Sequence, residues 1–135
     1  LIRAFPFPDR LHWDPFIPRE KIPAVMHGHD VLVQPSEEEN FGSSVAEAQA
    51  CGLPVIVGAT NGNADFLCPR DIHLTDNDPG TLATAFRELS RRRAEQSLGD
   101  PGDSRRCAEK HFSPPAVMDR FLDILRETAS SARTS

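Results

Sequence analysis

The stretch HDVLVQPSEEENFGSSVAEAQACGLPVIVG, residues 29–58, decides the fold of this chain. It places a polar loop and a predicted helix, from about 43 to 51, between two short apolar runs, DVLVQPS (30–36) and PVIVG (54–58). Short, branched, apolar runs are typical of strands in a parallel sheet that helices cover on both faces. Gly52 is placed to end the helix, and the proline two residues later prevents the helix from resuming. The stretch therefore predicts a β-α-β unit.

Strand and helix patterns alternate on both sides of this stretch. The further strands are predicted at LHW (11–13) and within DIHLTDND (71–78), and the further helices from Arg19 to about His29, from Pro79 onward, and within 113–130. RRRAEQSLGDPGDSRR (91–106) is interpreted as a charged surface segment. This alternation predicts an α/β fold with a Rossmann-like parallel sheet and flanking helices.

Length and composition indicate one globular domain. The chain has 135 residues, 39% of them hydrophobic, and a net charge of −5, which disfavours a nucleic acid or an anionic membrane as its main partner. No window approaches the roughly 18 to 20 apolar residues of a membrane span. The opening LIRAFPFPDR lacks the features of a secretion signal, and three cysteines at irregular spacing argue against a disulfide framework. A cytoplasmic location is therefore expected.

The loop and helix start after the first apolar run predict an anion site. In parallel sheets ligands bind beyond the carboxyl ends of the strands. A helix that begins near Ser43 turns its free N–H groups, and about half a positive charge, toward that edge. Gly42 allows a phosphate to approach closely. Because helical side chains lean toward the N-terminus, we expect the carboxylates of Glu39 and Glu47 to flank the anion.

Carboxylates are poor partners for phosphate but good acceptors for hydroxyl groups. An anion site with a carboxylate on each side therefore suits a ligand made of a sugar, a diphosphate and a ribose. One glutamate would hold the sugar that is transferred, and the other would hold the ribose. Ser44-x-x-Glu47 also fits a capping box, in which Glu47 acts only on the helix end. Both interpretations fit the sequence.

The stretch resembles the donor-binding segment of the retaining glycosyltransferases of family four, which have the GT-B fold. The family pattern is a Glu, seven residues and a second Glu, usually opening Glu-Gly-Phe-Gly and closing Glu-Ala-x-Ala-Cys-Gly-x-Pro-Val. The residues of this chain that fall on the pattern are Glu39, Phe41, Gly42, Glu47, Ala48, Ala50, Cys51, Gly52, Pro54 and Val55. The resemblance covers roughly residues 11–128, and the segment 30–56 is its specific part.

The resemblance implies a role for each site residue. Glu39 is the implied catalytic residue and contacts the hydroxyls of the donor sugar. The implied binding residues for the sugar and the diphosphate are Glu39, Asn40, Phe41, Gly42, Ser43 and Ser44. Glu47 takes the ribose hydroxyls, while Phe16 and Ile17 lie beside the nucleotide base. The resemblance implies retention of configuration without a metal, and it implies no cofactor besides the nucleotide-sugar substrate.

The chain departs from the family pattern in several places. Asn40 stands where the family usually has Gly, and Asn is the next residue to tolerate a left-handed backbone. Pro15 replaces a common Gly beside the base. GNAD (62–65) stands in for Gly-Gly-x-x-Glu, so Asp65 is given no role. Family members have an acceptor-binding domain first. Their donor domain then begins with a strand, a basic pair and a helix, and the segment that this chain matches comes after them.

The expected organisation is a partial donor domain over residues 1–128, followed by a disordered tail over 129–135. The chain is expected to be the donor-binding part of a glycosyltransferase and to be inactive by itself. Its expected partners are a nucleotide-sugar donor, the missing acceptor domain or a complementing half, and further copies of itself that pair through an open sheet edge.

Two other functions remain open at this stage. The first is a nucleotide-sugar epimerase of the same two-domain fold, which would use a different acid/base set. The second is a module that binds a nucleotide or a partner without catalysis. A zinc site built from Cys68, His73 and Cys107 is disfavoured, since their spacing is not one of known zinc ligands.

Overall fold

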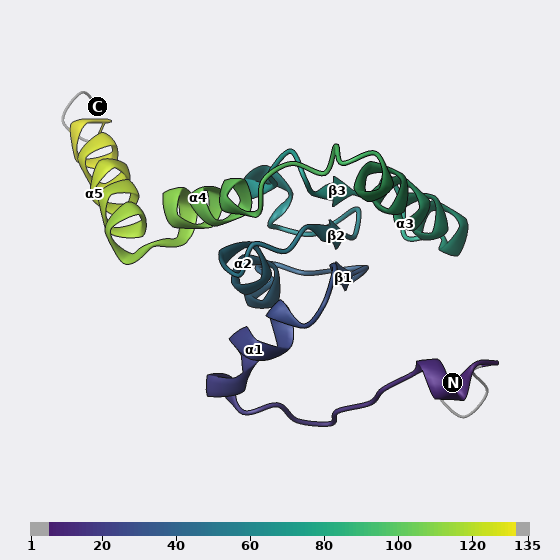
Figure 1. The fold of residues 1–135 in the computed structure, drawn as a ribbon. Helices are drawn as coiled ribbons and strands as arrows, with labels where there is room; N and C mark the ends of the chain where they lie inside the picture. The colour runs from purple at the N-terminus through teal and green to yellow at the C-terminus, as the bar shows by residue number, and fades with distance from the viewer. Residues whose placement is uncertain (1–5, 132–135) are drawn as a thin grey trace.

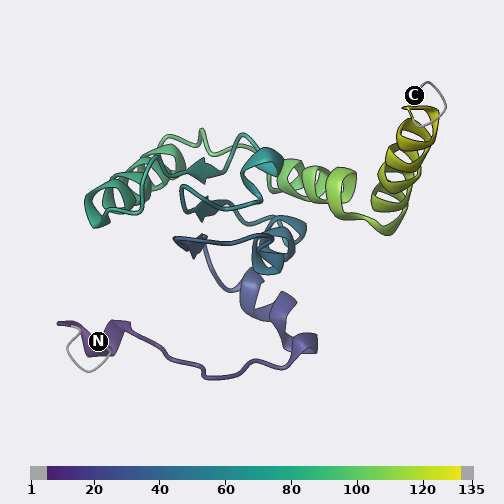
Figure 2. The same cartoon turned by 180° about the vertical axis from the view of Figure 1, so that it is seen from behind.

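The computed structural model describes residues 6–131 and has a parallel sheet with helices on both faces (Figures 1 and 2). The strands β1 (Leu32–Gln34), β2 (Val55–Val57) and β3 (Ile72–His73) lie in the order β1-β2-β3. In register, Val33 is paired with Ile56, and Ile56 with Ile72. The predicted class, an α/β fold with a Rossmann-like sheet, is confirmed.

Five α-helices connect and extend these strands in the described part of the chain. They are α1 (Ile22–His27), α2 (Ser43–Ala50), α3 (Pro79–Ala94), α4 (Pro101–Phe112) and α5 (Pro114–Ser131). Short 3-10 turns lie at Pro8–Arg10, Arg19–Lys21 and Ala64–Phe66. Among residues 6–131, none of the helices has the length and apolar character that crossing a membrane requires.

The central strand β2 is buried on both faces, as its uninterrupted apolar sequence predicts. Val55, Ile56 and Val57 are each 0% exposed, and successive side chains point to opposite faces. On one face the core continues into α2 through Val45 and Ala48, with Leu53 just after the helix. On the other face it continues into α3, with Ile56 beside Leu74, Ala85 and Leu89. The spacing of Leu82, Ala85, Phe86 and Leu89 in the sequence also predicts Phe86 on the apolar stripe of α3, but Phe86 is 42% exposed.

The end of α2 forms where the sequence predicts it. Gly52 has φ of +82°, a left-handed conformation that costs glycine little. Its N–H donates to the carbonyl of Gln49, and the N–H of Leu53 donates to that of Ala48. These two bonds form a Schellman motif, which satisfies carbonyls that the helix leaves free.

The charged segment 91–106 contains the end of α3 and the start of α4. Two predictions about secondary structure are wrong in detail. Residues 11–13 form no strand; Leu11 and Trp13 are exposed, and no strand lies beside them in the described part of the chain to supply hydrogen bonds. Helix α5 extends to Ser131, where serine hydroxyls bond back to the Glu127 carbonyl, so 129–131 are helical. Residues 132–135 of the predicted tail lie outside the described residues.

Candidate functional site

Helix α2 begins with uncapped N–H groups beside the carboxyl end of β1. Gly42 is the N-cap, with an extended backbone and no side-chain hydrogen bond to the helix. The N–H groups of Val45 and Ala46 both reach the Gly42 carbonyl, at 3.0 and 3.5 Å. Within residues 6–131, the N–H groups of Ser43 and Ser44 have no partner. The site therefore offers two free donors and the positive end of a helix dipole to an anion.

The capping-box interpretation of Ser44 and Glu47 is wrong. Because Gly42 is the N-cap, Ser44 is the second residue of the helix and Glu47 the fifth, too far along to reach back to the cap. No side chain in the described residues pairs with the Glu47 carboxylate. Its position is therefore not explained by helix capping.

The residues predicted to bind the nucleotide lie around one cavity. Phe16, Ile17, Ser44 and Glu47 line a hollow of about 380 Å³, whose far wall is formed by Met26 of α1 and its neighbours. The segment that carries Phe16 reaches this place from a long extended stretch before α1 (Figure 1). The structure thus brings together an aromatic ring, an aliphatic side chain, a hydroxyl and an unpaired carboxylate.

Glu39 is held at both its backbone and its side chain. Its carbonyl accepts from the N–H of Gly62 at 2.7 Å, as part of an isolated parallel bridge between Glu39 and Asn61. Its Oε2 accepts from Nε2 of Gln34 at 3.0 Å, and Oε1 of Gln34 accepts from the Ser44 hydroxyl at 3.3 Å. The side chain of Gln34 therefore links the Glu39 carboxylate to the first turn of α2.

The loop between β2 and β3 fixes the loop that carries Glu39. Asn63 is 1% exposed, and its Nδ2 donates to the carbonyl of Gly42 at 2.7 Å. Asn40, which stands where the family usually has Gly, is exposed. Its φ is not positive, so it does not adopt a left-handed backbone conformation. Sequence reasoning gave Asn61 and Asn63 no role, although Asn-Gly-Asn is a turn signal whose packing partner the sequence does not show.

Phe41 faces a second, more apolar cavity of about 670 Å³, which Ser43 and Glu47 also line. Its ring meets that of Phe112 edge to face, with centroids 5.5 Å apart. Arg120 of α5 also lines this cavity, with its guanidinium 5.3 Å from the centre of the Phe66 ring. Sequence reasoning missed Arg120, because it and Ser43 line the same cavity from segments about eighty residues apart.

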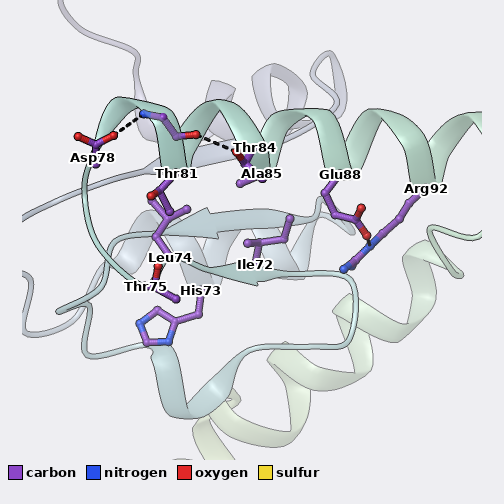
Figure 3. A pocket seen from close by; sticks show the side chains of 11 residues that line it. Ile72, His73, Leu74, Thr75, Asp78, Thr81, Thr84, Ala85, Glu88 and Arg92 are labelled. Atoms are coloured by element: carbon purple, nitrogen blue, oxygen red, sulfur yellow. Dashed lines mark hydrogen bonds and ion pairs between the residues drawn. The ribbon is translucent and has the colours of Figure 1, made fainter.

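Another cavity, of about 510 Å³, lies between β3 and α3 and contains none of the predicted site residues (Figure 3). Figure 3 shows Glu88 and Arg92 meeting at one end, where Nε of Arg92 donates to Oε1 of Glu88 at 2.7 Å. At the other end Asp78 accepts from the N–H of Gly80 at 2.7 Å and caps α3. These polar groups satisfy one another, so they offer little to a ligand.

No metal centre is formed by the candidate ligands. Within residues 6–131, no group of three His, Cys, Asp or Glu side chains is arranged to hold an ion. Cys68 is buried, which raises the pKa of its thiol, and a hydrogen bond with the Cys107 thiol raises it further. His73 instead contacts the carbonyl of Ala59, at 3.1 Å.

Comparison with known proteins decides the family. Residues 1–103 match the family described as "Glycosyl transferases group 1". The chain belongs to the group 1 glycosyl transferases. Among curated members, it is 41% identical over 64 residues to the 2-deoxystreptamine N-acetyl-D-glucosaminyltransferase of Streptomyces fradiae, which covers 47% of this chain and 15% of that protein. It is 28% identical over 138 residues to the D-inositol 3-phosphate glycosyltransferase of Salinispora tropica, covering 99% of this chain and 28% of that protein.

A solved structure has the same fold. The sucrose-phosphate synthase of Thermosynechococcus elongatus superposes with a TM-score of 0.73 and 25% identity, over 91% of this chain and 31% of that chain. This group 1 chain therefore spans under a third of the length of the relatives described above.

Proposed function

We propose that this chain binds a nucleotide-diphosphate sugar and is the donor-binding part of a retaining glycosyltransferase. The observation that carries the proposal is the start of α2. The N–H groups of Ser43 and Ser44 are unpartnered, the Glu39 carboxylate is linked to Ser44 through Gln34, and the Glu47 carboxylate pairs with no described residue. The family match supports this function over that of an epimerase.

In this proposal the diphosphate lies at the first turn of α2. The N–H groups of Ser43 and Ser44 donate to its oxygens, where the helix dipole favours negative charge. Gly42 has no side chain, so the diphosphate can approach the backbone closely. Asn40 and Phe41 belong to the loop that leads to Gly42. Arg120 lines the neighbouring cavity, with its guanidinium over the Phe66 ring. Helix N–H groups without strong cations give weak binding, so we expect a dissociation constant on the order of millimolar.

The nucleoside lies in the cavity beside α2. The Glu47 carboxylate accepts hydrogen bonds from the ribose hydroxyls, and the base rests against Phe16 and Ile17, which line the same cavity. Phe16 is 79% exposed, so a base can stack on its ring without displacing other side chains.

The transferred sugar lies against Glu39. A carboxylate held there accepts from the sugar hydroxyls and stabilises positive charge as the bond to the diphosphate breaks. We propose that no metal and no further cofactor takes part, as the family resemblance implies.

The acceptor, in this proposal, binds to another part of the protein. The chain covers 31% of the matched sucrose-phosphate synthase chain, so we assign the acceptor site to a separate domain or a complementing subunit. We therefore expect the 135-residue chain to bind a donor but to transfer no sugar by itself. Transfer to an acceptor by the purified chain would contradict this assignment.

Titration of the isotopically labelled chain tests the donor site. UDP, GDP, UDP-glucose and GDP-mannose are added in turn to millimolar concentration, and amide chemical shifts are followed by NMR. We expect at least one nucleotide to shift the amides of Ser43 and Ser44 and of residues around Phe16. Shifts confined to the cavity between β3 and α3, or no shifts at all, would contradict the proposal.

Substitution of the two glutamates separates their roles. Glu47→Gln should weaken nucleotide binding about tenfold at an unchanged melting temperature, because a charged acceptor contributes roughly 1.5–3 kcal/mol against about 1 for a neutral one. Glu39→Gln should spare the nucleoside diphosphate and weaken only the nucleotide sugar. Glu38→Gln, in the exposed part of the loop, is the matched control. If Glu47→Gln binds as tightly as the parent, Glu47 does not hold the ribose.

A further inference from the structure

We infer that Gln34 is a positioning residue for the donor sugar, since it fixes the carboxylate of Glu39 in one orientation. The inference rests on the proposed role of Glu39. Gln34 is the last residue of β1, and its side chain lies on the same face of the sheet as Leu32, two residues earlier, which packs toward α2. The side chain therefore points from the sheet directly toward the start of α2.

The neighbours of Gln34 decide which way its amide group points. A carboxylate accepts hydrogen bonds, and the Gln34 amide presents Nε2 to the Glu39 carboxylate, at 3.0 Å. Oε1 then faces the Ser44 hydroxyl, which donates to it at 3.3 Å. Turning the amide over would place two oxygens against each other at Glu39. These two neighbours therefore fix one orientation of the Gln34 amide, with its NH₂ group toward Glu39 and its oxygen toward Ser44.

Gly42 makes this close packing possible. A Cβ on Gly42 would collide with the Gln34 amide, lying 3.0 Å from Nε2 and 3.1 Å from Cδ. The amide thus lies directly against the backbone that caps α2. The side chain of Gln34 therefore contacts the Glu39 carboxylate, the N-cap residue Gly42 and the Ser44 hydroxyl.

This arrangement prepares Glu39 for the sugar before the sugar arrives. The Gly62 N–H holds its backbone at 2.7 Å and Gln34 holds Oε2, so Oε1 and the remaining acceptor positions are left for ligand hydroxyls. A side chain that is already ordered loses less conformational freedom when the ligand binds. Without Gln34, Glu39 would keep its charge but lose its fixed direction.

The test compares Gln34→Leu and Gln34→Glu in the 135-residue chain. Gln34→Leu removes both polar contacts, whereas Gln34→Glu has the same shape, still accepts from Ser44 and places a second carboxylate against Glu39. Affinities for UDP and UDP-glucose, or for GDP and GDP-mannose, are measured by NMR titration. We expect UDP affinity to stay within twofold, while the preference for UDP-glucose over UDP falls about fivefold in Gln34→Leu and further in Gln34→Glu.

A double-mutant cycle separates positioning from a general effect on the fold. If Gln34 acts through Glu39, then adding Gln34→Leu to Glu39→Gln should cause no further loss of sugar preference. Additive losses, or equal weakening of UDP and UDP-glucose by Gln34→Leu, would overturn the inference. If Glu39→Gln itself leaves the sugar preference unchanged, the proposed role of Glu39 fails and this inference fails with it. If Glu39→Gln weakens sugar binding and Gln34→Leu does not, only this inference fails.

The hydrogen bond itself is tested without any ligand. The side-chain NH₂ signals of Gln34 should be shifted downfield in the parent chain, and the shift should disappear in Glu39→Ala but persist in Glu38→Ala. Identical Gln34 signals in the parent and in Glu39→Ala would overturn the inference whether or not a nucleotide sugar binds.

Discussion

At the scale of single residues, the loop that carries Glu39 is held by a second loop that approaches it very closely. Gly62 lies so near that a Cβ there would collide with the Asn40 carbonyl. Its N–H bonds to the Glu39 carbonyl, and the Thr60 hydroxyl donates to the carbonyl of Glu37. Glycine is therefore needed at position 62 because a side chain has no room there, and not because the backbone is left-handed.

We predict that Gly62→Ala destabilises the chain and disturbs the Glu39 loop. Overpacking against a backbone atom costs about 1–3 kcal/mol, because the two loops must move apart. The matched control is Gly28→Ala, where a Cβ would meet its nearest atom at 3.4 Å, an ordinary contact. Urea unfolding measures the stability, and amide shifts report the loop. Equal stability of the two variants would show that the loops yield without cost.

At the scale of secondary-structure elements, two helices begin with the same Asp-Pro-Gly sequence but are held in different ways. Asp78 and Asp100 each cap a helix by accepting from the glycine two residues later. Helix α3 has an apolar stripe that predicts its packing. Helix α4 is instead held against α2 by small residues and by Arg70, which donates to the Gly52 carbonyl at 2.7 Å and to the Ser104 hydroxyl at 3.1 Å.

The charged face of α3 predicts a pH dependence of stability. Hydrogen bonds from Arg91 and then Arg92 lower the pKa of Glu88 from 4.5 to about 2. A lowered folded-state pKa means that the contribution of Glu88 is present above about pH 4.5 and is lost as the pH falls toward 2. The fall in melting temperature between pH 5 and pH 2.5 should therefore be smaller for Glu88→Gln than for the parent.

The effect is expected to be small, because Glu88 is partly exposed and water screens its ion pairs. Glu109→Gln, on the exposed side of α4, is the control and should follow the parent. A parent and a Glu88→Gln variant with the same acid dependence would contradict the assigned pairing.

At the scale of the whole molecule, helix α5 and the edge strand β1 expose surfaces that pair with no element in the described part of the chain. Helix α5 projects beyond α4 (Figures 1 and 2), and none of its residues is buried. Its exposed apolar residues are Val117, Met118, Phe121, Leu122, Ile124 and Leu125. Strand β1 also lies at an edge of the sheet, where its outer backbone groups are unpaired.

We predict that the chain self-associates at high concentration. Open strand edges and exposed apolar stripes both favour pairing with another chain. Light scattering should detect dimers or larger species, and Phe121→Asp should reduce them, whereas Phe86→Asp on α3 should not. A monodisperse monomer at several milligrams per millilitre, for the parent chain, would contradict the prediction.

The sequence by itself determined the features that depend on neighbouring residues. The apolar runs of β1 and β2, the start of α2 near Ser43 and its end at Gly52 follow from local periodicity and capping, which act over a few positions. The same stretch was sufficient to predict the family, since the pattern around Glu39 and Glu47 is itself local. Phe16, Ile17 and Glu47, for which the resemblance implies contacts with the nucleotide, line one cavity in the structure.

Only the tertiary structure decided the features that depend on distant segments. Residues 11–13 stay irregular because a strand needs a neighbouring strand, and α4 packs because Arg70 reaches it from 34 positions away. Arg120 of α5 lines the second cavity. Gln34 at the end of β1 and Asn63 in the loop after β2 both bond to the loop that runs from Glu39 to Gly42. Hydrogen bonds and packing across such separations depend on how the whole chain folds, and the spacing of residues along the sequence does not specify them.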